Sequence, residues 1–240
     1  MDKLQLWQRY QDWLYYNEKL NLYVDISRMR FDDDFYNSMK SKFDHAFENV
    51  AKLEQGAIAN PDENRMVGHY WLRNPDIAPN SEIKNEINDT VTKIKDFATK
   101  IHKGIITTPQ GEKFTDLLSI GIGGSALGPQ FVSQALTGND PELKIHFIDN
   151  TDPAGIDRTI DRIRERLKTT LVLVISKSGG TPETRNGMIE AKHAYQQQGL
   201  DFGRYAVAIT MMNETSKLYQ VAQKENWLDC FPMFDLFLVL

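Results

Sequence analysis

The chain has a single cysteine, Cys230, among its 240 residues. One cysteine excludes the internal disulfide framework that small secreted domains use, and it fits a reducing compartment. The amino-terminal residues 1–7 lack the apolar core of a signal peptide, and no apolar run approaches the roughly 20 residues of a membrane span. We therefore expect a cytoplasmic protein that makes no use of a membrane.

The sequence also lacks an excess of basic residues, and its cysteine and histidines are not spaced like metal ligands. The 33 acidic residues outnumber the 28 lysines and arginines, which gives a net charge of −5. That balance argues against nucleic acid as a partner, because nucleic-acid binding calls for a basic patch. One cysteine and five scattered histidines show no ligand spacing, so no metal site is expected. Hydrophobic residues make up 41% of the chain, enough for a substantial core.

The residue pattern changes near Gly111. From about Phe114, apolar segments alternate with helical ones, which predicts a parallel sheet covered on both faces. The fold class is therefore α/β, a five-stranded parallel sheet flanked by helices and preceded by a helical amino-terminal region. The expected strands are 117–122, 144–148, 171–175, 205–209 and 228–231, and the expected helices are 127–136, 153–167, 182–198 and 214–224.

Before Gly111 the chain is polar and rich in aromatic residues, and its spacing predicts helices and loops. One helix is expected to carry on a single face Leu4, Trp7, Leu14 and Leu22. A second stripe recurs every four residues and is expected to pack in a core; it consists of Phe31, Phe35, Met39, Phe43 and Phe47. Helical spacing also continues through 83–101.

A glycine-rich turn follows the first strand expected in the sheet. The apolar run 117–122 ends at Gly123-Gly124-Ser125, and a helical pattern follows. Glycine lets the backbone approach a ligand without a Cβ in the way, and the amides that open a helix attract an anion. A phosphate is the anion that such a turn most often holds, although similar turns also serve only tight packing.

A second turn of this kind follows the apolar run 171–175. Its sequence, Ser-Lys-Ser-Gly-Gly-Thr-Pro-Glu-Thr, occupies 176–184 and offers hydroxyl and amide donors to a phosphate. The alternative is a loop with good helix-capping residues and no ligand. Two such turns at the carboxyl ends of neighbouring strands favour the binding interpretation, because open α/β folds bind ligands there. A nucleotide is disfavoured, since neither P-loop spacing nor a full dinucleotide fingerprint is present.

These motifs resemble the glucose-6-phosphate isomerase family. The segment 120–129 is similar to the family's first phosphosugar-binding loop, and 176–184 to its second phosphate loop. Further similar stretches, in the family's order, are 63–73, 149–152 and 231–235. The resemblance implies a helical region over 1–110, a sugar isomerase (SIS) domain over 111–235 and an aberrant apolar tail over 236–240.

The resemblance implies the interconversion of glucose 6-phosphate and fructose 6-phosphate through an enediolate, a step of glycolysis and gluconeogenesis that needs no cofactor. Complete family members are expected to be homodimers. The resemblance assigns substrate phosphate binding to Gly124, Ser125, Ser176, Lys177, Ser178 and Thr181. Charged acceptors strengthen such hydrogen bonds to about 1.5–3 kcal/mol each.

Three matched residues have less direct roles. Lys177 could act through its backbone amide as much as through its charge, and a purely structural role is the alternative. Glu183 follows the second loop and is expected near the site, but the family's C2 base lies elsewhere; an acidic residue in a first helical turn is the simpler interpretation. His69 is expected to be structural or to support the site indirectly.

No catalytic residue is expected in this chain. The resemblance places the family's glutamate base, ring-opening histidine and late lysine beyond residue 240, in a second SIS domain. Three interpretations stay open: a truncated isomerase inactive alone, the front half of a longer isomerase, and a non-catalytic sugar-phosphate-binding module. The uniformly apolar segment 236–240 resembles an aggregation-prone edge more than an evolved ending, which disfavours the module.

Overall fold

The computed structural model describes residues 1–62 and 64–235, and the chain forms two compact units that divide between Lys52 and Leu53. The domain boundary near Gly111 therefore stays a prediction, and the predicted apolar tail 236–240 lies outside the described residues. Among the helices of the described part, none is both long and apolar enough to cross a membrane.

The first unit contains a helix, a hairpin and most of a second helix: α1 (Lys3–Trp13), β1 (Leu14–Asn17), β2 (Leu22–Asp25) and α2 (Asp33–Glu54). The prediction of one helix reaching Leu22 is wrong. Aromatic residues with high strand propensity follow α1, and Tyr16 pairs with Tyr23 across the hairpin with ring centroids 4.3 Å apart. Asn21, with φ 47°, allows the turn.

Helix α2 forms where the phenylalanine stripe predicts a helix, but the prediction that the stripe is core is wrong. Phe47 is 73% exposed and Phe35 55% exposed, and α2 has no buried residue. The repeat correctly indicates an amphipathic helix, because spacing reports local periodicity. Burial depends on a partner surface, which spacing does not encode.

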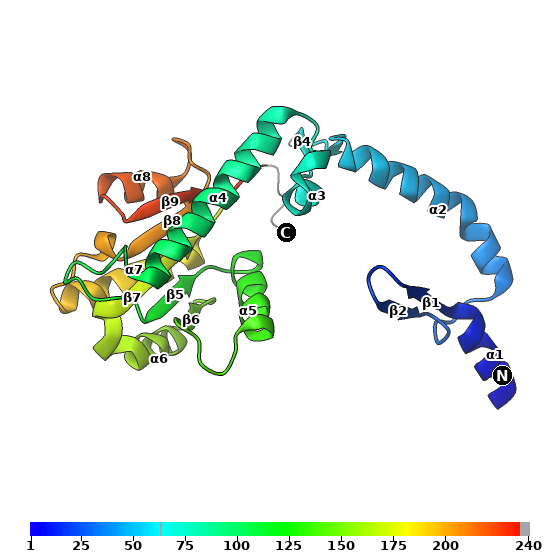
Figure 1. Ribbon diagram of the computed structural model, residues 1–240, viewed down its shortest axis with the longest axis horizontal. Coiled ribbons are helices and arrows are strands. Elements are labelled where there is room, and N and C mark those ends of the chain that lie inside the picture. The colour runs from blue at the N-terminus through cyan, green and yellow to red at the C-terminus, as the bar shows by residue number, and fades with distance from the viewer. Residues whose placement is uncertain (63, 236–240) are drawn as a thin grey trace. The chain divides into compact units, whose positions relative to one another are not determined.

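The second unit begins with two short strands and leads through helices into a parallel sheet (Figure 1). The elements before the sheet are β3 (Ile58–Asn60), β4 (Arg65–Met66), α3 (His69–Arg73), a 3₁₀ turn (Pro75–Ile77) and α4 (Ser81–Lys103). The sheet strands are β5 (Asp116–Ile120), β6 (Lys144–Ile148), β7 (Thr170–Ile175), β8 (Ala206–Thr210) and β9 (Asp229–Pro232). The connecting helices are α5 (Gly124–Leu136), α6 (Pro153–Ile163), α7 (Pro182–Gln197) and α8 (Lys217–Lys224), and 3₁₀ turns span Arg164–Thr169 and Phe202–Arg204.

All five sheet strands are parallel and lie in the order β6-β5-β7-β8-β9. The predicted fold class is confirmed, and each predicted strand begins within one residue and ends within two residues of the observed one. Register is fixed by pairs such as Ile120 with Val174, which brings the ends of β5 and β7 level with each other.

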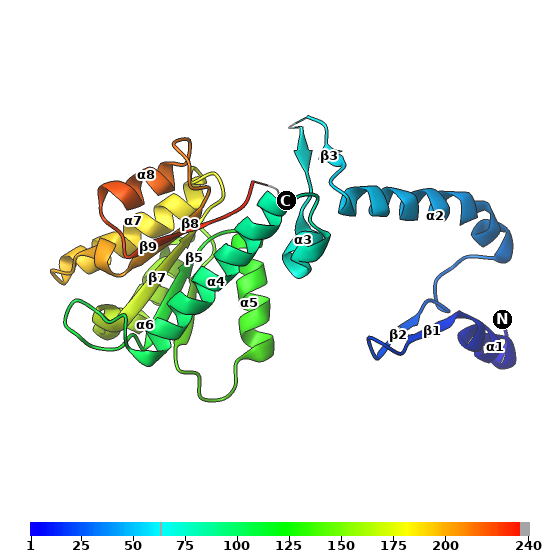
Figure 2. The same cartoon turned by 45° about the horizontal axis from the view of Figure 1, so that its top comes forward.

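Helices cover both faces of this sheet (Figures 1 and 2). On one face, Leu117, Leu171 and Leu173 face helix α4. On the other, the close approach of α7 depends on Gly187, where a Cβ would lie 2.8 Å from Ile148. Continuous apolar strands such as β7 are expected for a sheet buried on both sides. The sheet therefore rigidly positions the loops at its carboxyl edge.

Candidate functional site

The two predicted phosphate turns leave adjacent strands at the same edge of the sheet. The first follows β5 and the second follows β7, and these strands are hydrogen-bonded neighbours. From β5 the chain moves to β6 on one side, and then returns past β5 to β7 on the other. The turns therefore lie at the point where the strand order reverses, which is where open α/β sheets bind ligands.

The first turn presents the amino end of α5. Gly123 occupies the N-cap position with φ 56° and ψ −125°, a conformation that strains residues with a side chain, and it makes no side-chain capping bond. Gly124 is exposed at the first helical position, and Ser125 is half-buried behind it. The backbone N–H of Ser125 donates to the Ile122 carbonyl at 3.1 Å, which holds the turn closed. Exposed amides and a hydroxyl thus meet the positive end of the helix dipole.

The second turn is ordered by its own hydroxyl groups. Ser176 is buried, and its Oγ donates to Oγ1 of Thr181 at 3.1 Å. Ser178 is exposed, and its Oγ accepts from the N–H of Gly180 at 3.2 Å. Thr181 is the N-cap of α7 but makes no side-chain capping bond. The first amides of α7 therefore have no capping side chain to compete with an anion.

Gly179 locks this turn against the neighbouring helix. Its φ of 66° suits glycine, and a Cβ there would lie 2.6 Å from the backbone nitrogen of Leu218 and clash with the Ser216 hydroxyl. The turn is thus packed directly on the start of α8. Such contact fixes the donors before any ligand binds, which lowers the entropic cost of binding.

The backbone of Lys177 is held by strand β8. Its carbonyl accepts from Met211 N at 3.1 Å and from Thr210 Oγ1 at 3.2 Å, and Thr210 shares a 2.7 Å hydroxyl contact with Ser216. The Lys177 side chain is 13% exposed, and its Nζ lies 3.5 Å from the carboxylate of Asp235. The Lys177 side chain therefore makes a structural contact. This agrees with the structural role that the sequence left open as an alternative to phosphate binding.

Asp235 joins three of the recognised sequence stretches. It lies 3.1 Å from Nη1 of Arg65 as well as near Lys177. Arg65 belongs to the segment that folds around Trp71, which is fully buried and donates from Nε1 to the Glu54 carbonyl at 2.8 Å. Sequence reasoning missed this convergence, because the partners lie 58 or more residues apart.

The two remaining predicted residues lie at helix starts. Glu183 is half-buried in the first turn of α7, beside the second loop, as the resemblance implies. His69 is the exposed first residue of α3, near the fully buried Trp71. The supporting roles of Glu183 and His69 stay predictions.

The sequence did not predict a role for Thr184, but the structure shows that its buried hydroxyl lacks a hydrogen-bond partner within the described residues. It is 4% exposed, and its Oγ1 is the one buried side-chain polar atom without a hydrogen-bond partner among residues 1–62 and 64–235. A buried unpaired hydroxyl costs about 1–3 kcal/mol. Only its position in the first turn of a helix, next to Ser- and Thr-rich sequence, could have indicated it.

The geometry supports anion binding more than proton transfer. Two uncapped helix starts and four hydroxyl residues occur at one edge of the sheet, namely Ser125, Ser176, Ser178 and Thr181. Hydroxyl and amide donors with a positive helix end suit a phosphate group. In the part of the chain that the structure describes, no group of three or more His, Cys, Asp or Glu residues is arranged to hold a metal ion.

Sequence comparison identifies the relatives of this chain. Residues 25–230 match the family model of phosphoglucose isomerase. A glucose-6-phosphate isomerase of Rippkaea orientalis is 64% identical over 235 residues, and one of a Nostoc species is 65% identical over 235 residues. Both alignments cover 98% of this chain and 44% of the relative.

A solved structure agrees with the sequence relatives. The crystal structure of a glucose-6-phosphate isomerase from Chlamydia trachomatis superposes with a TM-score of 0.78 at 25% identity, covering 96% of this chain and 44% of that one. A hypothetical protein of Thermus thermophilus shares the fold at a TM-score of 0.56 and 22% identity. The chain thus spans less than half the length of the relatives it matches. Because the family model matches most of its residues, the chain belongs to the phosphoglucose isomerase family.

Proposed function

We propose that this chain forms the sugar-phosphate-binding part of a glucose-6-phosphate isomerase, which interconverts glucose 6-phosphate and fructose 6-phosphate. The observation that carries the proposal is the pair of uncapped helix starts after the neighbouring strands β5 and β7. The names of the curated relatives supply the substrate class. In this proposal the phosphate lies between the turns, and the sugar extends over Gly124.

The predicted clamp assigns a role to each polar residue. Ser125 donates a hydroxyl hydrogen bond to a phosphate oxygen, and the Ser176 hydroxyl, which donates to Thr181 in the free chain, turns to the phosphate on binding. Ser178 and Thr181 complete the shell. Lys177 contributes its backbone amide, since its amino group already lies near Asp235. Hydrogen bonds to a charged acceptor contribute about 1.5–3 kcal/mol each, so each hydroxyl changes affinity by tenfold or more.

We expect the 240-residue chain to bind substrate without turning it over. Isomerisation needs a base at C2 and an acid that opens the ring. The resemblance assigns neither role to a residue of this chain. In the whole protein we propose a cytoplasmic homodimer in which the remaining residues supply that chemistry.

Calorimetry with fructose 6-phosphate tests the clamp. Ser125→Ala and Ser176→Ala should each weaken binding at least tenfold, and fructose without its phosphate should not bind detectably. Ser133→Ala, farther along the same helix α5, is the matched control and should leave affinity unchanged. Equal affinity for fructose and fructose 6-phosphate would overturn the proposal.

A coupled assay for glucose 6-phosphate formation tests the expectation that the chain alone does not turn substrate over. No turnover is expected from the chain alone at any substrate concentration. Turnover that survives in the Ser125→Ala variant would show that the reaction does not pass through the proposed site.

A further inference from the structure

A cavity lies behind the second phosphate turn and is lined by residues of α7 and α8. Figure 2 shows these two helices on the same side of the sheet. The volume of the cavity is about 180 Å³. Its wall includes Ser176, Gly179 and Thr181 from the turn, whereas its floor belongs to the helices and to β7. The cavity therefore lies on the face of the sheet that α7 and α8 cover, and no residue of the first turn lines it.

Thr184 supplies this cavity with an unused hydrogen-bonding group. The residue lines the cavity, is 4% exposed and has no partner for Oγ1 within the described residues. Buried hydroxyls are nearly always paired, so the Thr184 hydroxyl is available to a ligand atom once its side chain turns toward the cavity that the residue lines. An unpaired hydroxyl can either donate to an anion or accept from a donor.

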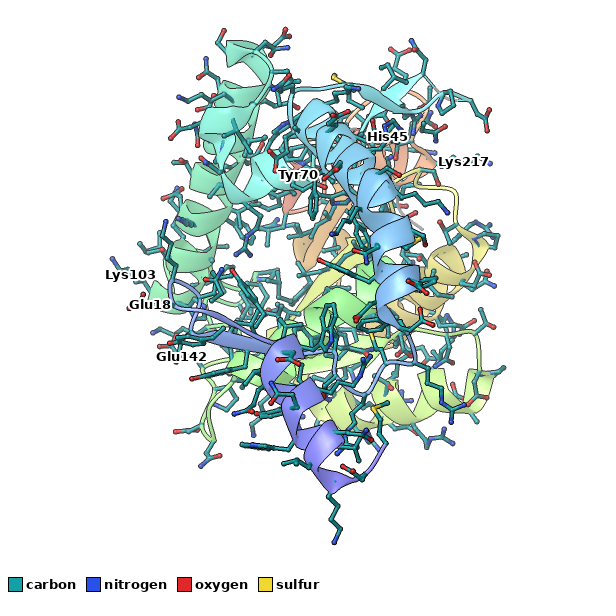
Figure 3. All side chains as sticks on the ribbon, turned by 90° about the vertical axis from the view of Figure 1, so that its right-hand side faces the viewer. Glu18, His45, Tyr70, Lys103, Glu142 and Lys217 are labelled. Carbon is teal, nitrogen blue, oxygen red and sulfur yellow. The ribbon has the colours of Figure 1, made fainter. Side chains whose placement is uncertain are left out.

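The charges around the cavity indicate whether the Thr184 hydroxyl would donate to an anion or accept from a donor. Arg185 and Lys217 line it, and neither has a carboxylate partner among residues 1–62 and 64–235. Lys217, labelled in Figure 3, is exposed at the first position of α8, so its amino group can reach a ligand at the mouth. The amino ends of α7 and α8 both border the cavity and add partial positive charge. The polar side of the cavity thus favours an anion.

The floor of the cavity is apolar. It is formed by Val174, Met188, Leu218 and Val221. A phosphate ion alone would leave these side chains without contact, whereas a short hydrocarbon chain would cover them. Drug-sized pockets have roughly 300–1,000 Å³, and an apolar cavity of about 150 Å³ holds a benzene-sized molecule. The volume therefore suits a ligand with a chain of a few carbon atoms.

We propose that the cavity between α7 and α8 binds a small organic carboxylate whose charged group meets Thr184, Arg185 and Lys217 and whose short apolar chain lies on Met188. The site is separate from the sugar-phosphate clamp but shares the wall formed by Ser176 and Thr181. Its occupant packs against the back of the second turn.

Nuclear magnetic resonance of the chain with ¹³C-labelled methionine methyl groups tests this site, with hexanoate as the probe. The Met188 methyl signal, assigned through Met188→Leu, should shift in a saturable way. Hexanol has the same chain without the charge and should bind at least tenfold more weakly. Absence of a Met188 shift, or equal binding of hexanoate and hexanol, would overturn the proposal.

Substitutions locate the charged group. The double change Arg185→Gln and Lys217→Gln should weaken hexanoate binding at least tenfold, and Thr184→Val should weaken it at least threefold. Lys224→Gln, at the far end of α8, is the matched control and should leave binding unchanged. Unchanged affinity in the double variant would contradict the assignment, and because these side chains are exposed, folding is not at risk.

The test is independent of the proposed function. Ser125→Ala changes the other turn. It should leave hexanoate binding unaltered while it weakens the binding of fructose 6-phosphate. If fructose 6-phosphate fails to bind but hexanoate shifts Met188, only the clamp proposal fails. If hexanoate binding disappears in Ser125→Ala, the probe occupies the clamp and the separate cavity site is wrong.

Discussion

The two units of this chain are organised by different interactions. In Leu53–Leu240 the parallel sheet buries large apolar side chains completely, including Leu118, Val172 and Tyr195. In Met1–Lys52 the helices α1 and α2 have no buried residue. There Arg9 donates to three backbone carbonyls at 2.7–3.0 Å, and Trp13 makes edge contacts with the rings of Phe31 and Tyr36.

The contrast shows what an amphipathic pattern does and does not determine. Both units contain regular apolar periodicity, which correctly predicts α2 in the first unit and the helices that connect the sheet strands in the second. Only the second unit surrounds its apolar faces with other elements. Local spacing therefore predicts an element, whereas the free energy of burial requires a partner surface.

The largest expected effect separates the two units directly. Leu118→Ala should lower the free energy of unfolding by about 2–5 kcal/mol, because it leaves a cavity in a fully buried strand. Phe47→Ala, at a 73% exposed position on α2, should change it by less than about 0.5 kcal/mol. Urea unfolding followed by circular dichroism measures both. Equal losses would show that α2 packs as tightly as β5.

Sequence predicted the sheet better than it predicted the contacts of the site. Continuous apolar runs bounded by glycine identify β5 and β7, and the turns follow them. The ion pairs of Asp235 with Arg65 and Lys177 were not predictable, because residues far apart in sequence carry no local signal of pairing. The exposure of α2 was missed for the same reason.

The next effect concerns the turn that connects the sheet to the proposed site. Gly179→Ala should cost about 2–3 kcal/mol, since φ 66° alone costs about 1–2 kcal/mol and the new Cβ also meets Leu218 N at 2.6 Å. Gly199→Ala is the control, because its φ is 70° but no atom lies within 4 Å of the added Cβ. Thermal unfolding should show the larger loss at Gly179, together with weaker binding of fructose 6-phosphate. Equal losses at the two positions would mean that backbone conformation alone determines the cost at both, and that the contact with Leu218 adds nothing.

A buried carboxylate gives the sheet unit a pH dependence. Asp116 is 1% exposed at the start of β5, and its carboxylate lies 2.8 Å from His146 Nε2 and 3.1 Å from Arg166 Nε. Burial raises the pKa of Asp116, but hydrogen bonds from Arg166, His146 and Thr115 outweigh it, so the pKa lies below its usual value of 3.8. The ionised form therefore contributes stability at neutral pH that is lost as pH falls below about 4.

Asp116→Asn tests that contribution. The substitution should lower the free energy of unfolding by about 1.5–3 kcal/mol at pH 7, where charge-assisted hydrogen bonds are lost. Below about pH 4 the difference from the unaltered chain should shrink, since protonation removes the same charge. Urea unfolding between pH 2.5 and 7 measures both curves. Parallel curves across that range would refute the assigned role of Asp116.

The smallest effect should be confined to the first unit. Arg9 donates to the carbonyls of Ser27, Met29 and Phe31, and its guanidinium carbon lies 4.5 Å from the centre of the Phe31 ring. Arg9→Met keeps an apolar stem but removes the donors, which should lower the local opening free energy by about 1 kcal/mol. Hydrogen exchange should then speed up in β1 and β2 while amides of β5 and β7 keep their protection, because the units open separately. Loss of protection in the sheet would show that the first unit contributes to the stability of the second, and the contrast between them would have to be abandoned.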